Sequence, residues 1–347
     1  EQGLPAWARE LLRAGLRDPA RCTELQLWWG RGKGDKIKIT ALPASFGQQL
    51  AALKELSLSN NALASLPDSY GQELAALKKL RLFGPGFTDA GVAGLSALGA
   101  LQSLTLEKTD VTDEALVQLA KMRGLRELKL PYAAITDSGL QALQDLSQLR
   151  SLQLLRTNTS DSGVVHLQPL ENLVALDLRD TQVSNTGLEV VGAMKKLRDF
   201  KITNGDRITS EGVRHLAGLP ALSVLGLELS GVDDDALRHV AAAAELKELY
   251  LSGTFISDQG RSIPCHGETD QDPSAEHGHV HCHRQLHGSA AAGSARSDGD
   301  HRDLGLHRVR ETEHRSALPD PQADGRERDQ GHRLHLDRRG HPHPGAQ

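Results

Sequence analysis

The chain has 347 residues and a formal net charge of −5 at pH 7, and 38% of its residues are hydrophobic. This charge predicts no strong preference for nucleic acid or for membrane surfaces, and no apolar run approaches the roughly 20 residues that a membrane helix needs. The first 261 residues contain Cys22 and no other cysteine, which excludes a disulfide framework there. We therefore expect a protein that binds neither nucleic acid nor a membrane.

Residues 1–48 are predicted to cap the N-terminal end of a repeat array, because a first repeat would otherwise expose its apolar layer. The positions of Leu4, Trp7 and Leu11 indicate an amphipathic helix, and Leu25-Gln26-Leu27 is typical of a short, degenerate first strand. The basic segment 31–36 lacks the Gly-x-x-x-x-Gly-Lys-Ser/Thr order of a phosphate-binding loop. We interpret this segment as part of the cap.

The pattern Leu-x-x-Leu-x-Leu occurs nine times in the middle of the chain, once with Phe200 and Ile202 in place of the second and third leucines, at intervals of 24 residues with one of 25. Its first leucines are Leu53, Leu77, Leu101, Leu125, Leu149, Leu173, Leu197, Leu222 and Leu246. A fixed period of this size indicates a solenoid in which each repeat packs on its neighbours. We predict a repeat array over residues 49–261.

Residues 101–116 illustrate the first half of one repeat. Alternation at Leu104 and Leu106 predicts a short strand with one buried face. Thr109 follows at a tight turn, where buried backbone groups need a polar partner. The same column contains Asn61, Thr157, Thr181, Ser230 and Thr254. We expect these side chains to form a series of hydrogen bonds through the turns, each contributing about 1 kcal/mol.

The second half of each repeat begins with Thr-Asp-x-Gly or a close variant. Examples are residues 88–91, 136–139, 160–163 and 257–260. Thr or Ser at this place caps a helix by accepting its first free N–H groups, and the acid complements the positive helix end. Apolar residues then follow at helical spacing, as at Leu140, Leu143 and Leu146. Stacked repeats therefore predict an α/β fold with a curved parallel sheet on the concave side and helices on the convex side.

These motifs closely resemble those of the leucine-rich repeat superfamily over residues 50–260. The Thr-Asp-x-Gly-Leu form is similar to bacterial repeats of about 24 residues and to the repeats of F-box substrate receptors. Residues 42–47 and 66–71, with their Leu-Pro-x-Ser-aromatic-Gly pattern, look like repeats of bacterial type III effectors and plant intracellular proteins. The resemblance implies a solenoid that binds a protein partner and is not an enzyme.

Binding is expected on the concave side, because strand residues between the leucines alternate away from the core. Two columns there are rich in basic residues, partly offset by Glu55, Glu127, Asp199 and Glu248, and aromatic residues of the kind that anchor interfaces lie beyond the strands. We predict a protein partner with an acidic patch. The predicted contact residues are Lys78, Arg81, Phe83, Arg126, Lys129, Tyr132, Arg150, Arg198, Lys201 and Tyr250. The alternative is that these basic residues only keep a long solenoid soluble.

No catalytic arrangement is recognisable in the repeats. His166, His215 and His239 lie on separate predicted helices one or two periods apart, so they cannot form a triad. The acidic run 233–235 has the charge to attract Ca²⁺, but it starts a helix, where carboxylates are expected anyway. We predict no enzyme activity, no cofactor and no metal, and we expect a monomer.

Residues 262–347 lack the leucine period and are rich in His, Arg, Asp and Pro. The run 277–283 offers alternating histidines to Zn, Ni or Cu, and Cys265 adds a ligand, but no second paired set at zinc-finger spacing follows. This composition is typical of a disordered tail. A metal-binding tail is the weaker alternative.

A frameshift after Gly260 is a further interpretation of this tail. Reading one nucleotide forward, Thr269-Asp270 and Ser274-Ala275 can each encode Leu, and Asp272-Pro273 can encode Ile. This restores Leu-x-x-Ile-x-Leu about one repeat period after Leu246. Sequencing the gene tests the idea, and an uninterrupted frame in close relatives that carry the same tail would refute it.

Two functions follow from the resemblance and stay open at this point. The array is either a protein-interaction module in itself or the substrate-recognition part of a ubiquitin ligase or of a secreted bacterial effector. No F-box-like segment or catalytic Cys motif is visible, so the second function requires an activity encoded elsewhere. The compartment stays open between the cytoplasm and secretion.

Overall fold

A computed structural model describes most of the predicted array and short pieces on either side of it. The described residues are 22–27, 39, 41–42, 45–48, 50–59, 61–67, 69–261, 268–269 and 279–283. The predicted helix near Trp7, the basic segment 31–36 and most of the tail lie outside these residues. The domain boundaries, the disorder of the tail and the frameshift therefore stay predictions.

The described part of the chain forms a parallel sheet of ten strands in chain order, as the repeat period predicts. The strands are β1 (Glu24–Gln26), β2 (Glu55–Ser59), β3 (Lys79–Phe83), β4 (Ser103–Glu107), β5 (Glu127–Lys129), β6 (Ser151–Gln153), β7 (Ala175–Asp177), β8 (Asp199–Lys201), β10 (Val224–Gly226) and β12 (Glu248–Tyr250). β14 (His279–His283) then pairs antiparallel with β12, and β13 (Glu268–Thr269) pairs with β14.

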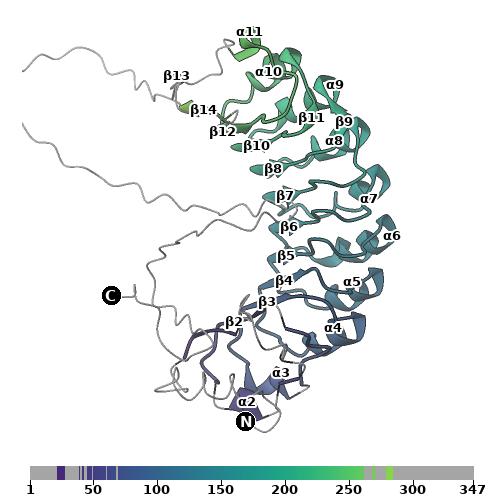
Figure 1. Cartoon of the computed structure of the whole chain (residues 1–347), viewed down its shortest axis with the longest axis vertical. Helices are drawn as coiled ribbons and strands as arrows, with labels where there is room; N and C mark the ends of the chain where they lie inside the picture. The colour runs from purple at the N-terminus through teal and green to yellow at the C-terminus, as the bar shows by residue number, and fades with distance from the viewer. Residues whose placement is uncertain are drawn as a thin grey trace, which may run out of the picture. The chain divides into compact units, whose positions relative to one another are not determined.

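Short helices follow the strands and lie on the outer side of the curved sheet, whereas the strands line its inner side (Figure 1). The helices are α2 (Ser45–Gln48), α3 (Tyr70–Glu73), α4 (Asp89–Leu95), α5 (Asp113–Leu119), α6 (Asp137–Leu140), α7 (Asp161–Val165), α8 (Asn185–Val191), α9 (Ser210–Val213), α10 (Asp234–Val240) and α11 (Asp258–Arg261). Two 3₁₀ turns, η2 (Gln141–Asp145) and η3 (Leu216–Gly218), extend α6 and α9, and a small second sheet pairs β9 (Gly205–Thr209) with β11 (Ser230–Gly231). The α/β solenoid expected from the sequence is confirmed.

The core lies between the sheet and the helices and is built from the periodic leucines. Leu104 and Leu106 of β4 and Leu116 of α5 are each 0% exposed. Equivalent residues are paired strand to strand, because the register sets Leu80 beside Leu104 and Leu104 beside Leu128. Each repeat therefore buries its apolar residues only against its two neighbours.

Five of the six residues in the turn column form hydrogen bonds, as predicted, but most of these bonds stay within one repeat. The Thr157 hydroxyl donates to the Leu154 carbonyl at 2.8 Å, and Ser230, Thr181 and Thr254 donate in the same way to the carbonyl three residues before them. Asn61 differs, because its amide nitrogen donates to the Leu27 carbonyl of the preceding strand segment. The Thr109 hydroxyl is buried without a hydrogen-bond partner.

The acid of the Thr-Asp-x-Gly motif has a role that the sequence reading missed. Asp113 at the start of α5 reaches the next repeat, where its Oδ1 accepts the Thr136 N–H at 2.8 Å and its Oδ2 accepts the Thr136 hydroxyl at 2.5 Å. The same pair of bonds joins Asp89 to Thr112, Asp137 to Ser160, Asp161 to Ser184, and Asp234 to Ser257. Helix capping by the preceding Thr or Ser is partial: Thr112, Ser160 and Ser184 accept an N–H two residues on, whereas Thr88 and Thr136 do not.

Two further pairs of neighbouring repeats are joined by other side chains, which again match each donor with an acceptor. The Asn185 amide oxygen accepts the Thr209 N–H at 3.0 Å, and its amide nitrogen donates to the Thr209 hydroxyl at 2.8 Å. In the next link the roles reverse: the Ser210 hydroxyl donates to Asp233 at 2.6 Å and accepts the Asp233 N–H at 3.1 Å. We call this series of contacts the inter-repeat bridge.

The glycine of the motif makes room for this bridge. A Cβ atom at Gly187 would lie 2.5 Å from Val183 Cγ1 and 2.6 Å from Asp161 Oδ1, and both distances are shorter than real Cβ contacts. The same clash with the bridging side chain would occur at Gly139, Gly163, Gly212 and Gly260. The Thr, the Asp and the Gly of the motif are therefore three parts of one contact between neighbouring repeats.

The bridge predicts different outcomes for two substitutions of Asp137. Asp137→Ala removes the acceptor of both Ser160 donors, so we expect a loss of about 2–3 kcal/mol in unfolding free energy. Asp137→Asn keeps an acceptor for the N–H and gains a donor for the hydroxyl, as Asn185 does, so we expect a loss below about 1 kcal/mol. Urea unfolding followed by circular dichroism measures both. A loss below about 1 kcal/mol for Asp137→Ala would show that this bridge contributes little to the stability of the array.

The glycine prediction has a matched control. Gly187→Ala should destabilise the protein by about 1–3 kcal/mol, because the new methyl group displaces the Asp161 carboxylate. A Cβ at Gly218 meets no atom within 4 Å, so Gly218→Ala should be neutral or raise the stability by up to about 1 kcal/mol. Thermal unfolding of both variants is the measurement. A neutral Gly187→Ala would contradict the close approach.

Candidate interaction surface

The inner face of the sheet is the side that the helices do not cover (Figure 1). In β5, Leu128 is buried against the helices, so Glu127 and Lys129 share the opposite face. The equivalent pairs in the other strands alternate in the same way. We call this side of the strands the open face.

The structure separates the predicted contact residues into three groups. Arg81, Lys129, Lys201 and Tyr250 lie within strands on the open face, as expected. A second group, which includes Arg126, lies one residue before the start of a strand. This group is Lys78, Arg126, Arg150 and Arg198. The remaining two, Phe83 and Tyr132, lie at and beyond the strand ends.

Of the predicted basic residues within the strands, Lys129 and Lys201 have acidic partners on the open face, whereas Arg81 makes no ion pair with a residue that the structure describes. Lys129 Nζ lies 2.9 Å from Glu127 Oε1 in the same strand, and Lys201 Nζ lies 3.8 Å from Asp199. Burial raises the pKa of Glu127, but hydrogen bonds from Ser103 and Lys129 outweigh it and lower the pKa below its usual value. Glu127 is therefore ionised at neutral pH, and the open face contains acidic as well as basic side chains.

Tyr250 also forms a hydrogen bond with an acidic residue. Its hydroxyl donates to Glu248 Oε2 at 2.6 Å. Burial, followed by this acceptor, raises the pKa of Tyr250 well above the usual value, so the phenol stays a neutral donor.

The edge at which the strands begin is different, because its basic side chains are exposed and make no ion pair with any residue that the structure describes. Arg126 and Arg150, for example, lie directly before the neighbouring strands β5 and β6. The full row is Lys54, Lys78, Arg126, Arg150, Arg198 and Lys247. We call this row the strand-start edge. Because these charges have no acidic partner among the described residues, this row is expected to produce a stronger positive field than the open face, where Lys129 and Lys201 are paired.

At the opposite edge, the two predicted aromatic residues are stacked with cations that the sequence reading missed. The Lys108 ammonium lies 5.4 Å from the centre of the Phe83 ring and 4.9 Å from that of Tyr132. The Arg156 guanidinium lies 5.3 Å from the Tyr132 ring and pairs with Asp180 at 2.8 Å. The sequence signal was available, because Lys, Tyr and Arg occupy the position before the turn residue in three successive repeats.

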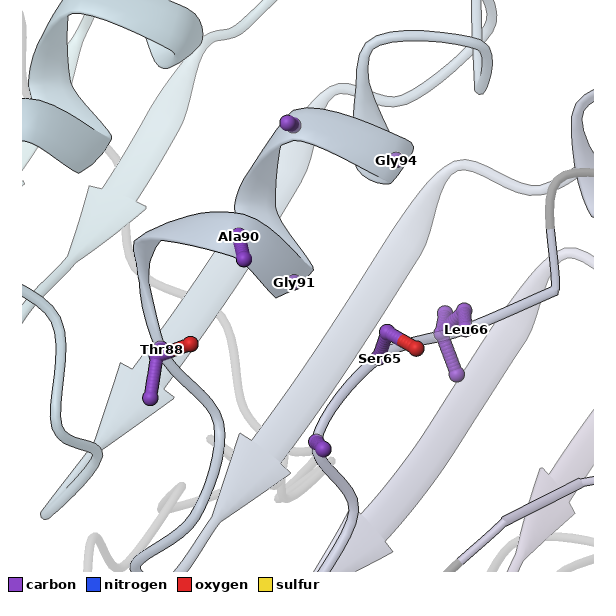
Figure 2. Close-up of a pocket in the computed structure, with 8 residues that line it drawn as sticks. Ser65, Leu66, Thr88, Ala90, Gly91 and Gly94 are labelled. Atoms are coloured by element: carbon purple, nitrogen blue, oxygen red, sulfur yellow. The ribbon is translucent and has the colours of Figure 1, made fainter.

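A hollow of about 530 Å³ lies between the last repeat with the Leu-Pro-x-Ser-aromatic-Gly pattern and the first repeat with the Thr-Asp-x-Gly pattern. Figure 2 shows Ser65 and Leu66 of one repeat facing the start of α4, with Thr88, Ala90, Gly91 and Gly94. Its other lining residues are Ala64 and Ala93, so none of them carries an ionisable side chain. The hollow contains the hydroxyls of Ser65 and Thr88, but none of its lining residues is an acid or base that could activate them as nucleophiles.

Within the described ranges, no group of three or more His, Cys, Asp or Glu residues is arranged to hold a metal ion. The acidic run at the start of α10 has other partners: Asp233 caps the helix, Asp234 bridges to Ser257, and Asp235 pairs with Arg238. The histidine run 277–283 lies outside the residues whose side chains the structure describes. No helix in the described part is long and apolar enough to cross a bilayer.

These features define a repeat solenoid with one open, side-chain-rich face. The chain belongs to the leucine-rich repeat family, because the family model described as a leucine-rich repeat region matches residues 33–260. Repeat proteins of this kind typically mediate protein–protein interactions and are generally non-catalytic. The comparison with curated proteins gave no match.

Several solved structures are similar in fold. An internalin (inlF) of Listeria monocytogenes is 20% identical, with a TM-score of 0.45 over 64% of this chain and 67% of that chain. A leucine-rich repeat protein of Leptospira interrogans is 17% identical, with a TM-score of 0.41 over 72% and 95%. A plant peptide hormone receptor, solved with a peptide, is 13% identical, with a TM-score of 0.37 over 67% and 48%. At these identities the similarity concerns the fold alone.

Proposed function

We propose that this chain is a protein-interaction module that holds an acidic protein partner across the open face and the strand-start edge. The observation that carries the proposal is the uncovered face of the ten-stranded sheet, with ordered polar and aromatic side chains along its length. A surface of this kind matches the extended concave surfaces that other solenoids use for binding. The predicted contact residues all lie on this face or at its two edges.

The charge distribution supports an acidic partner. Arg126 and Arg150 have no acidic partner of their own among the described residues, so an acidic protein would gain their full attraction. Lys129 and Lys201 already have intramolecular partners, so a ligand carboxylate has to compete with Glu127 or Asp199. The strand-start edge is thus expected to attract the partner, and the open face to provide paired and neutral contacts.

Reversing the charge of Arg126, Lys129 and Arg150 to Glu in the full chain tests the proposal. We expect capture of the partner to fall at least about tenfold while the melting temperature changes little, because all three side chains lie on the surface. Arg126→Glu with Arg150→Glu should account for most of this loss, since Lys129 is already paired. Quantitative mass spectrometry of cross-linked partners from source cells is the measurement.

A control with the same charge change separates surface from net charge. Lys121, Arg214 and Arg238 are exposed at the helices on the outer side. Their reversal to Glu should leave capture unchanged. Equal losses in both triple variants, or no loss in the first, would overturn a binding surface on the open face.

A further inference from the structure

One residue in most repeats adopts a left-handed backbone conformation just beyond the end of its strand. The φ angles are 51° at Lys108, 64° at Tyr132, 56° at Arg156, 54° at Asp180 and 53° at Leu229. Gly84 and Gly253 occupy the same column with φ angles of 119° and 71°. Glycine adopts such angles freely, whereas Lys, Tyr, Arg and Leu rarely do.

Backbone hydrogen bonds account for the left-handed conformation, but they do not account for the choice of Lys, Tyr or Arg at these positions. The N–H groups of Lys108, Tyr132 and Arg156 donate to carbonyls of the next repeat at 3.1, 2.8 and 3.0 Å. Gly84 donates in the same way to Glu107. Glycine therefore satisfies this position without strain, so the presence of Lys, Tyr and Arg indicates a use for their side chains.

These side chains form an ordered row that we call the cation strip: Phe83, Lys108, Tyr132 and Arg156. Lys108 lies between two aromatic rings, and Arg156 stacks on the second of them. Stacking orders two long side chains that are otherwise flexible, which lowers the entropy lost when they bind a ligand. Both cations are exposed, and Lys108 has no acidic partner among the described residues.

We propose that the cation strip binds an extended acidic segment of the protein partner, with one carboxylate at Lys108 and another at the Arg156 guanidinium, where it has to compete with Asp180. The two cations lie two strands apart, which corresponds to about 10 Å. Carboxylates two or three residues apart in an extended segment span about 7–10 Å. This inference rests on the proposed interaction function and adds the chemistry of the segment and the edge that receives it.

The test compares glycine variants of one column. Lys108→Gly with Arg156→Gly removes both cations and relieves the backbone, whereas Leu229→Gly relieves an equal φ angle and removes no charge. Leu229 is 65% exposed, so its loss costs little packing. The probe is a short fluorescein-labelled peptide that alternates Glu and Ser, and its Gln–Ser counterpart is the uncharged control. Fluorescence anisotropy at two salt concentrations gives affinity, and thermal unfolding gives stability.

We expect the double glycine variant to bind the acidic peptide about tenfold more weakly, with a melting temperature equal to or above that of the wild type. Leu229→Gly should raise the melting temperature without changing affinity. Unchanged affinity in the double variant would overturn the proposal, and so would a loss matched by Leu229→Gly. A large fall in melting temperature of the double variant would assign the strip a structural role instead.

Two further measurements separate this inference from the broader proposal. The variant with Arg126, Lys129 and Arg150 reversed is measured with the same peptide. Weaker binding there, with unchanged binding in the double glycine variant, would overturn the cation strip and leave the interaction function standing. Duplex DNA as competitor tests the other polyanion class: stronger binding of DNA than of the acidic peptide would overturn an acidic protein segment as the ligand.

Discussion

The fold depends on a contact in which one side chain at the start of a helical segment crosses to the next repeat and satisfies two donors there. Neighbouring strands lie about 4.8 Å apart, whereas packed helices need about 8–10 Å, and this difference bends the array. The bridge from Asp113 to Thr136, and its counterparts, hold the helix starts close to the sheet edge. At each crossing an N–H at a helix start, which has no partner within its own helix, receives a side-chain acceptor. The glycine beside the bridge allows the closest approach but is not required in every repeat, because Ala115 occupies its position beside the intact link from Asp89 to Thr112.

Variation along the array preserves this contact rather than its residues. Asn185 replaces the acid and supplies one acceptor and one donor, which suits the Thr209 N–H and hydroxyl. Ser210 then takes the position of the acid, and the acid appears in the following repeat as Asp233. Such an exchange is expected when neighbouring repeats must match each other, because only the sum of donors and acceptors is constrained. It also gives a sequence signal for the bridge that a reading of single repeats cannot provide.

The sequence predicted the parts of the structure that depend on period and alternation, namely the order of elements, the buried leucines and the turn column at Thr157. The bridge was read as helix capping because its second partner lies in another repeat, and only the register between repeats brings Asp137 to Ser160. The strands were expected one residue too early, since Arg126 still belongs to the turn and shares the Gln102 carbonyl with Glu127. The left-handed column was missed because Lys108 and Tyr132 are residue types that disfavour it.

The retention of Lys108 and Arg156 is not explained by stability alone. A left-handed conformation costs a non-glycine residue about 1–2 kcal/mol. An exposed cation–π contact contributes about 0.5–1 kcal/mol, and an exposed ion pair such as Arg156–Asp180 contributes about 0–1 kcal/mol. The internal contacts of the strip therefore contribute about as much as the backbone conformation costs, so they give Lys108 and Arg156 little advantage in stability over glycine. Stacking holds both cations in place before a ligand binds. The same contacts that add little to stability therefore reduce the conformational entropy that is lost on binding. The cations of the strand-start edge have no stacking or ion-pair partner among the described residues, so they are suited instead to long-range attraction. We therefore propose that the strand-start edge attracts the protein partner and that the cation strip holds it once bound.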